Sequence, residues 1–393
     1  MVINMKILLL NLWGVMDGKG GTEKVFFDMA GALAERNHDV TALVLENKTT
    51  PPFFNVSRKI SFVNCGMGFA AKFSFWQNLY IKLCPDKNKR HSYRDSIVDE
   101  QKAQRLEPII AKENPDVIIS FNAEATRVIK LYTHVECPII TMFHFNPEHI
   151  FSNCTDDTKK ALEMSECIQV LMPSFIEKTK EYISNKNIVC ISNIVPQYEF
   201  ENEIEHNRKN IILNLARLDK KQKRQHILIE AFAMLAKDFS NWTVEFWGEK
   251  DGDIKYYNYC RSLVKKHNLE GKVIFKGTTK DVERVLKNAK IFAFPSAFEG
   301  FGLALTEAMS AGLPCVGCKD GIAVNELIVD GKNGFLTDPN ANDYADKLKT
   351  LMINDEIREN MGICAKHSIM KYAPKNIWDE WEKLIRNVIY SKE

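Results

Sequence analysis

Residues 295–309 read PSAFEGFGLALTEAM, and this stretch decides the fold more than any other. The apolar residues 291–294 before it, with Lys290, predict a buried strand at 290–294. The segment around Gly300 is expected to be a loop, and 303–311 a helix. A strand, a glycine-containing loop and a helix in this order are typical of the βα unit of a parallel sheet. The stretch therefore predicts an α/β protein.

The same alternation of strands and helices extends on both sides of this stretch. Further strands of the second half are expected at 211–215, 243–247, 273–276 and 314–317, with a helix at 226–237. In the first half, strands are expected at 6–12, 40–45, 117–120, 139–143 and 168–172, with a helix at 22–36. The polar residues 197–210 lie between the halves and are interpreted as an interdomain linker.

The length also favours two domains, because 393 residues exceed what one hydrophobic core usually supports. We predict a Rossmann-like, doubly wound parallel-sheet domain at 1–197 and a second one at 198–375, facing each other across a cleft. Ligands of such sheets bind outside the carboxyl ends of the strands, so this cleft is the expected site.

The composition indicates a soluble globular protein. Hydrophobic residues make up 45% of the chain, charged residues 26%, and the formal net charge is +2, which gives no reason to expect a nucleic-acid partner. The apolar run at 7–12 stops before Gly14 and is too short for a signal peptide or a transmembrane span. Ten cysteines without a signal then predict free thiols and a cytoplasmic location.

No metal site is predicted. Cys315 and Cys318 form a Cys-x-x-Cys pattern without a second pair, and they are expected in a buried strand. Asp251 and Asp253 resemble an Asp-x-Asp metal motif, but the turn-rich stretch around them favours a surface loop.

Two loops are candidates for binding phosphate. Gly20 and Gly21 precede the first helix, where glycines allow a close backbone approach and free helix N–H groups suit an anion, although a plain flexible loop explains them equally well. Arg217 and Lys223 follow the first strand of the second half. An arginine fork and a lysine point charge can clamp a diphosphate there, with a solvated basic loop as the alternative.

The stretch at 295–309 adds two carboxylates to these cations. Glu299 lies in the loop and Glu307 in the helix that starts near Gly302. A carboxylate can accept from two vicinal hydroxyls, as in ribose or hexose, while free N–H groups at the helix start face phosphate. Solvent-exposed acids are the alternative, but large apolar residues beside Glu299 favour a packed loop or one that lines a site.

His144 follows the expected strand at 139–143, at the edge where a catalytic group would face the cleft. A structural histidine is the alternative. Pro147 separates His144 from Glu148 and His149, so one helix cannot present all three to a metal, and zinc is not expected.

Together these motifs resemble the retaining glycosyltransferases of family 4, which have the two-domain GT-B fold. The resemblance extends over nearly the whole chain, and its most specific part is Glu299-x7-Glu307 within 294–314. The other blocks are similar to the family's at 5–7, 20–23, 37–40, 216–218 with Lys223, 228–232 and 330–336.

The resemblance implies roles for these residues. Arg217 and Lys223 would neutralise the departing diphosphate, Glu299 would lie near the donor sugar, and Glu307 would hold the ribose hydroxyls. The glycine-loop amides would be those of Gly20 and Gly21, and the active-site histidine would be His144. The sugar and phosphates would face the peptide N–H groups of Phe301, Gly302 and Leu303.

The implied reaction transfers a hexose or N-acetylhexosamine from a nucleotide diphosphate sugar, most commonly a UDP-sugar, with retention of the anomeric configuration. The acceptor would be a glycan or lipid-linked molecule of surface polysaccharide synthesis, and no metal or other cofactor is expected. Two alternatives stay open: a nucleotide-sugar epimerase of the same fold, and a non-catalytic GT-B partner subunit. The retained Arg217, Lys223, Glu299 and Glu307 favour activity.

Two further segments carry expectations. Residues 69–94 combine aromatic and basic side chains, which suits peripheral docking on an anionic membrane surface at the inner face, with an insertion packed on its own domain as the alternative. Residues 376–393 are expected to form a C-terminal helix that packs back on the first domain, as is typical of this fold.

Overall fold

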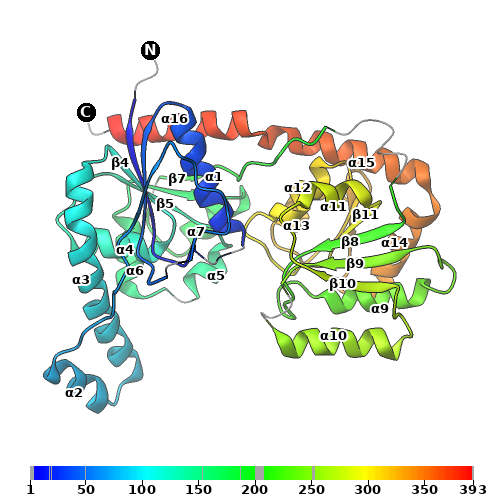
Figure 1. The fold of residues 1–393 in the computed structure, drawn as a ribbon, viewed down its shortest axis with the longest axis horizontal. Coiled ribbons are helices and arrows are strands. Elements are labelled where there is room, and N and C mark those ends of the chain that lie inside the picture. The colour runs from blue at the N-terminus through cyan, green and yellow to red at the C-terminus, as the bar shows by residue number, and fades with distance from the viewer. Residues whose placement is uncertain are drawn as a thin grey trace. The chain divides into compact units, whose positions relative to one another are not determined.

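The computed structural model describes residues 4–16, 18, 20–48, 50–152, 154–185, 187–199, 208–249 and 253–391, and these form two α/β units (Figure 1). One unit comprises Met1–Ser192 with Trp378–Glu393, and the other comprises Asn193–Ile377. The division therefore falls five residues before the expected boundary at 197/198, and the returning segment begins at Trp378 rather than 376. Most of the expected linker, 200–207, lies outside the described residues.

The described part of the first unit has a seven-stranded parallel sheet in the order β3-β2-β1-β4-β5-β6-β7. The strands are β1 (Lys6–Asn11), β2 (Asp39–Val44), β3 (Ser61–Asn64), β4 (Val117–Ser120), β5 (Ile139–Met142), β6 (Cys167–Val170) and β7 (Ile188–Cys190). The central strands are continuous apolar runs because both faces of a parallel sheet are covered. The short edge strands β3 and β7 were not predicted.

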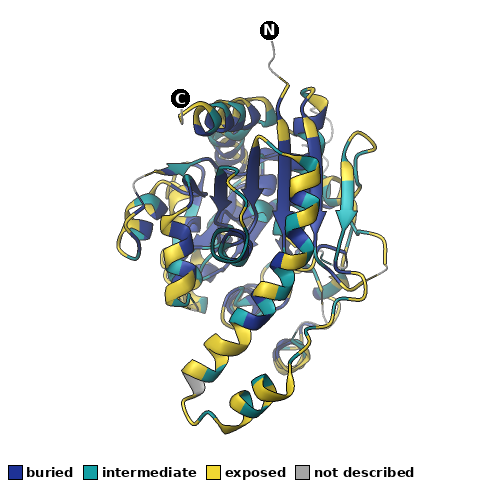
Figure 2. Cartoon of the chain, turned by 90° about the vertical axis from the view of Figure 1, so that its left-hand side faces the viewer, coloured by how far each residue is buried: buried dark blue, intermediate teal, exposed yellow. Residues whose placement is uncertain are grey.

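The helices of the first unit connect these strands. They are α1 (Gly21–Glu35), α2 (Phe75–Leu83), α3 (Lys87–Glu113), α4 (Ala123–Tyr132), α5 (Pro147–Phe151), α6 (Asp156–Glu163) and α7 (Ser174–Lys180). The second half of α3 packs Ala103, Leu106 and Ile110 into the core beside the sheet. Its first half and α2 project beyond the sheet and are largely exposed (Figure 2). Ser74 and Gln77 form a capping box that starts α2.

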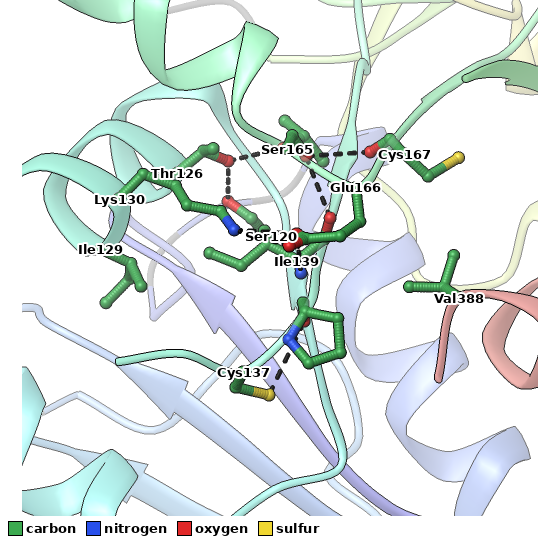
Figure 3. A network of polar contacts seen from close by, with 12 residues as sticks. Ser120, Thr126, Ile129, Lys130, Cys137, Ile139, Ser165, Glu166, Cys167 and Val388 are labelled. Carbon is green, nitrogen blue, oxygen red and sulfur yellow. Dashed lines mark hydrogen bonds and ion pairs between the residues drawn. The ribbon is translucent and has the colours of Figure 1, made fainter. Parts of the chain in front are cut away.

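Buried hydroxyls connect β4, β5 and α4 of this unit (Figure 3). The Thr126 hydroxyl on α4 lies 2.9 Å from Ser120 Oγ and 2.7 Å from Thr141 Oγ1. At the amino edge of the sheet, Glu166 Oε2 accepts a hydrogen bond from the Ile139 N–H at 2.7 Å. The same oxygen forms an ion pair with Lys130 Nζ at 2.8 Å. These groups are satisfied by one another, so their burial is tolerated.

The second unit has, in its described part, a six-stranded parallel sheet in the order β10-β9-β8-β11-β12-β13. The strands are β8 (Ile211–Leu215), β9 (Thr243–Trp247), β10 (Val273–Gly277), β11 (Ile291–Phe294), β12 (Cys315–Cys318) and β13 (Gly334–Thr337). The helices are α9 (Gln225–Leu235), α10 (Ile254–Lys266), α11 (Val282–Asn288), α12 (Leu303–Ser310), α13 (Val324–Leu327), α14 (Ala341–Ile353) and α15 (Asp355–Ile369). The α/β architecture with two doubly wound sheets is confirmed.

The last helix, α16 (Pro374–Tyr390), begins in the second unit, and its remainder belongs to the first. Arg36 pairs with Asp379 at 2.8 Å, and His38 Nε2 lies 3.2 Å from Glu382. The buried Trp381 adds apolar contact on the same helix. Both charge pairing and burial therefore fix the C-terminal helix to the first unit.

Candidate active site

The basic loop between β8 and α9 is an ordered structure rather than a freely solvated segment. Asp219 Oδ1 accepts the N–H groups of Lys221 and Gln222 at 2.9 and 2.7 Å. Its carbonyl oxygen accepts those of Lys223 and Arg224, both at 3.0 Å. Asp219 thus stabilises the turn through its side chain, as in an Asx-turn, and through its carbonyl group. These bonds fix the backbone position of Lys223.

Lys223 reaches across to the loop after β11 and pairs with Glu299. Lys223 Nζ lies 2.5 Å from Glu299 Oε1, and the two side chains are only 11% and 10% exposed. The ammonium group also lies 5.3 Å from the centroid of the Phe294 ring. At this burial the pair is screened little by water, so a ligand that replaces either partner must supply an equivalent charge or hydrogen bond.

Arg217 lies beside this pair and remains open to solvent, with 55% of its side chain exposed. Its Nη2 donates to Gln222 Oε1 at 2.7 Å and lies 3.7 Å from Asp219. Gln222 also donates from Nε2 to the Phe298 carbonyl at 3.0 Å, and its own carbonyl accepts the Ala297 N–H at 2.8 Å. Gln222 therefore hydrogen-bonds the basic loop to the loop after β11, which carries Glu299. Sequence reasoning missed it because a glutamine between lysines looks like a solvated residue.

The loop that carries Glu299 is held by the segment before α13. The Glu299 N–H donates to the Ile322 carbonyl at 3.1 Å, and the Ile322 N–H donates to the Ala297 carbonyl at 3.0 Å. These bridges fix the backbone of the loop on both sides of Phe298. Glu299 is thus presented by a braced loop and not by a solvated one.

Helix α12 starts at Leu303 after Gly302, whose φ of 83° lies in the left-handed region that favours glycine. No side chain caps this helix among the described residues. Phe301 is buried, and its ring centroid lies 5.2 Å from that of Tyr372. The Phe301 side chain therefore belongs to the core, so its peptide group alone is the candidate for ligand contact.

Glu307 is buried on α12 and is not the exposed helix acid of the alternative interpretation. Tyr198 lies near it, and burial together with the negative charge of Glu307 raises the pKa of the tyrosine. The Tyr198 N–H donates to Ser310 Oγ at 3.2 Å, and the Ser310 hydroxyl in turn donates to the Pro196 carbonyl. Residues 196–198 thus cover the C-terminal part of α12.

The glycine loop of the first unit leads from β1 to α1, which starts at Gly21 with Gly20 as its cap residue. A Cβ atom on Gly20 would lie 2.7 Å from Glu23 Oε2, and one on Gly18 would lie 2.4 Å from Glu23 Cγ. The Glu23 side chain therefore folds back over the loop and packs against both glycines.

His144 follows β5, and its ring is stacked on Phe121 with 5.1 Å between the centroids. Its Nε2 is buried and has no hydrogen-bond partner among the described residues. Burial lowers the pKa of His144 to about 4, so the ring is neutral at pH 7. A neutral imidazole with an unused nitrogen can hydrogen-bond a ligand but cannot act there as a cation.

The residues considered for metal binding have other roles. Asp253 caps α10 by accepting the Tyr256 N–H at 2.9 Å, whereas 251–252 lie outside the described residues. Cys315 and Cys318 are buried in β12, and burial raises the pKa of Cys318 to about 11. Within the described ranges, no group of three His, Cys, Asp or Glu side chains is placed to hold a metal ion.

The structure connects Arg217, Lys223 and Glu299 at the carboxyl ends of β8 and β11, in a single network that runs through Gln222. In the other unit, Gly20 and Gly21 lie at the start of α1, which follows β1, and His144 follows β5. The assignment of these residues to catalysis and donor binding stays a prediction.

Comparison with known proteins supports a glycosyltransferase fold. Residues 197–368 match the family model Glycosyl transferases group 1. An uncharacterized glycosyltransferase of Haemophilus influenzae is 25% identical over 378 residues, covering 93% of this chain and 96% of the relative. The amylovoran biosynthesis glycosyltransferase AmsD of Erwinia amylovora is 24% identical over 392 residues, covering 96% and 99%.

The crystal structure of an S. aureus TarM variant in complex with Fondaparinux, alpha-GlcNAc-glycerol and UDP has a TM-score of 0.75 at 16% identity. The superposition covers 97% of this chain and 100% of the TarM chain. At this identity the likeness shows the fold alone. The two parallel-sheet units thus have the GT-B fold, and residues 197–368 resemble the Glycosyl transferases group 1 domain.

Proposed function

We propose that this chain is a retaining glycosyltransferase that transfers a hexose or N-acetylhexosamine from a UDP-sugar to a glycan or lipid-linked acceptor in surface polysaccharide synthesis. The observation that carries the proposal is the poorly exposed Lys223–Glu299 pair with the open Arg217 beside it. The name of the AmsD relative and the UDP bound to TarM support the polysaccharide and the donor assignments.

The proposed chemistry depends on exchanging one anion for another at Lys223. The donor diphosphate takes the place of the Glu299 carboxylate at the ammonium group, and Arg217 adds a second cation. Glu299 is then available to accept hydrogen bonds from the sugar hydroxyls, and Glu307 to accept those of the ribose. The amides of Phe301, Gly302 and Leu303 add neutral donors for the sugar and phosphates.

Bond changes follow from this arrangement. The acceptor hydroxyl oxygen bonds to the anomeric carbon as the bond from that carbon to the diphosphate oxygen breaks. The hydroxyl proton passes to the leaving phosphate on the same face of the sugar, so the configuration is retained. The cations stabilise the charge that develops on the leaving group, and the mechanism requires neither a protein nucleophile nor a metal. Neutral His144 contributes a hydrogen bond near the sugar.

The test is a thermal-shift screen of the full chain against UDP, GDP and ADP sugars, followed by turnover assays on the hits with and without glycan acceptors. A double variant that combines Arg217→Ala with Lys223→Ala is expected to lose both nucleotide stabilisation and turnover, whereas the exposed Lys221→Ala keeps both. Unchanged behaviour of the double variant would refute the proposal. Sugar isomerisation without acceptor would instead favour an epimerase, and binding without turnover a partner subunit.

We further propose that the enzyme is cytoplasmic and docks on an anionic membrane through residues 69–94. Phe75 and Trp76 at the start of α2 are 73% and 74% exposed. The segment contains six lysine or arginine residues and one aspartate, Asp86, although the whole chain has a net charge of only +2. Exposed aromatic rings beside cations suit the headgroup region of such a bilayer. Among the described helices, none is long and apolar enough to cross a membrane.

Flotation of the protein with vesicles containing phosphatidylglycerol tests this docking. Replacing both aromatics by serine is expected to abolish flotation, and neutral vesicles are expected to bind poorly. Met234→Ala removes an apolar side chain that is 52% exposed from the other unit and serves as the control. Equal flotation of all variants, or none with the unaltered protein, would contradict the docking.

A further inference from the structure

A buried carboxylate lies beneath the glycine loop of the first unit. Glu46 follows β2 and is only 8% exposed. Its Oε2 accepts the N–H of Val15 at 2.7 Å and that of Met16 at 3.0 Å. Two successive backbone N–H groups that converge on one oxygen form a small anion-binding nest. In this chain the nest is filled by a side chain of the protein itself.

The main chain of Glu46 is fixed independently of its side chain. Asn64, the last residue of β3, accepts the Glu46 N–H at 3.0 Å and donates to the Glu46 carbonyl at 2.9 Å. A Cβ atom on Gly66 would lie 2.1 Å from Glu46 N, so any larger residue at position 66 would displace this segment. The backbone of Glu46 is therefore fixed by β2 and β3, and its carboxylate fixes the positions of Val15 and Met16 relative to these strands.

The negative charge of Glu46 lies in a region that is expected to approach a phosphate, so it must be offset by nearby donors or cations. A carboxylate near a phosphate is unfavourable unless its charge is offset by donors. Here two amides offset it, and Lys48 Nζ lies 3.4 Å from Oε1. The N–H groups of Val15 and Met16 are already bonded to Glu46, and the amides of Gly20 and Gly21 at the start of α1 are the candidates for a ligand anion.

We infer that Glu46 is a positioning residue, which sets the β1–α1 loop so that the backbone at Gly20 and Gly21 meets the donor of the proposed transferase reaction. It does not touch the donor. The inference rests on the proposed function for its kinetic consequence, whereas its structural part, the ordering of the loop, stands on the contacts of Glu46 alone. A displacement of a positioning group by about 1 Å can cost about a hundredfold in rate.

The chain offers a matched control in Glu166. This carboxylate also accepts a backbone N–H, that of Ile139 at 2.7 Å, and also pairs with a lysine, but it lies at the amino edge of the same sheet (Figure 3). Removal of either carboxylate leaves buried backbone donors without their partner and lowers stability. Only the removal of Glu46 should alter the glycine loop.

The experiment compares Glu46→Ala, Glu46→Gln and Glu166→Ala in the full chain. Glu46→Ala is expected to lower kcat/KM for the UDP-sugar at least about tenfold while UDP affinity changes less than about twofold, because the nucleotide is held by the second unit. Glu46→Gln keeps one acceptor oxygen and should lose less. Glu166→Ala should lower Tm but leave kcat/KM unchanged.

Amide hydrogen exchange supplies a readout that does not need activity. Peptides covering residues 12–24 should exchange faster in both Glu46 variants and not in Glu166→Ala. Unchanged exchange in these peptides, or equal kcat/KM in Glu46→Ala and Glu166→Ala, would overturn the inference. If the unaltered protein used no nucleotide sugar, the proposed function would fail, and the exchange data would still decide the role of Glu46.

Discussion

The carboxyl edges of the two sheets differ in how they use charge. In the second unit, charged side chains contact one another or lie open, as Lys223 does with Glu299 and Arg217 does beside them. In the first unit, the buried Glu46 is bonded to backbone amides, and His144 is neutral. We infer that the second edge neutralises a ligand's charge, whereas the first supplies shape and neutral hydrogen bonds. On this inference, two sheets of the same fold differ in how much of the ligand's charge each one neutralises.

The largest expected effect follows from removing the cation of the second edge. Lys223→Ala should lower kcat by about a hundredfold to a thousandfold, because one preorganised group that stabilises developing charge is worth that much. It also leaves the poorly exposed Glu299 without its cation. Steady-state kinetics with the UDP-sugar provide the measurement, and Lys221→Ala in the same loop is the control. A loss below about threefold would contradict the unequal division of charge between the edges.

A backbone change at the same edge should have a smaller effect. Gly302→Ala forces a residue with a side chain into φ of 83° at the start of α12, which costs about 1–2 kcal/mol. Because the amides beside it are proposed to face the donor, nucleotide affinity should also fall. Gly331→Ala introduces similar strain, at φ of 74°, in an exposed turn with open space around it. Equal nucleotide affinity in the two variants, by calorimetry, would argue against a role for the α12 amides.

The neutral histidine of the first edge predicts a pH dependence of stability. The pKa of His144 is lowered to about 4, so the unfolded chain binds a proton there before the folded chain does. Stability should therefore fall as pH decreases from about 6.5 to about 4, by at most about 3 kcal/mol from this group. Denaturant unfolding of the unaltered protein and of His144→Gln, compared between pH 7 and pH 4, isolates this contribution. Parallel pH curves would show that His144 is not held neutral.

Much of the fold could be predicted from the sequence, because buried parallel strands are apolar on both faces. The strands at 211–215 and 243–247 have the predicted bounds. The edge strands β3 and β7 were missed because they are short and only partly buried, and β13 because it contains and follows glycine in a turn-rich segment. The helices α2 and α3 were missed as helices because exposed aromatic and basic residues obscure their helical periodicity.

The candidate site could likewise be predicted from the sequence only in part. Arg217, Lys223 and Glu299 could be selected from the sequence because each follows a predicted strand at the edge where ligands bind. Glu46 could not, because its partners Val15 and Met16 lie about thirty positions away and are bonded through their backbones. Backbone hydrogen bonds leave no residue-type signature, and a glutamate after a strand looks like a surface acid.

The exchange of anions at Lys223 is tested most directly by measuring UDP affinity, by calorimetry, in Glu299→Gln and Lys223→Ala side by side. If the diphosphate takes the place of Glu299, Glu299→Gln frees the ammonium group and should bind UDP at least as tightly as the unaltered protein, although its turnover falls. Lys223→Ala should then bind UDP at least about tenfold more weakly. Equal UDP affinity in the two variants would mean that the ion pair does not open to receive the donor.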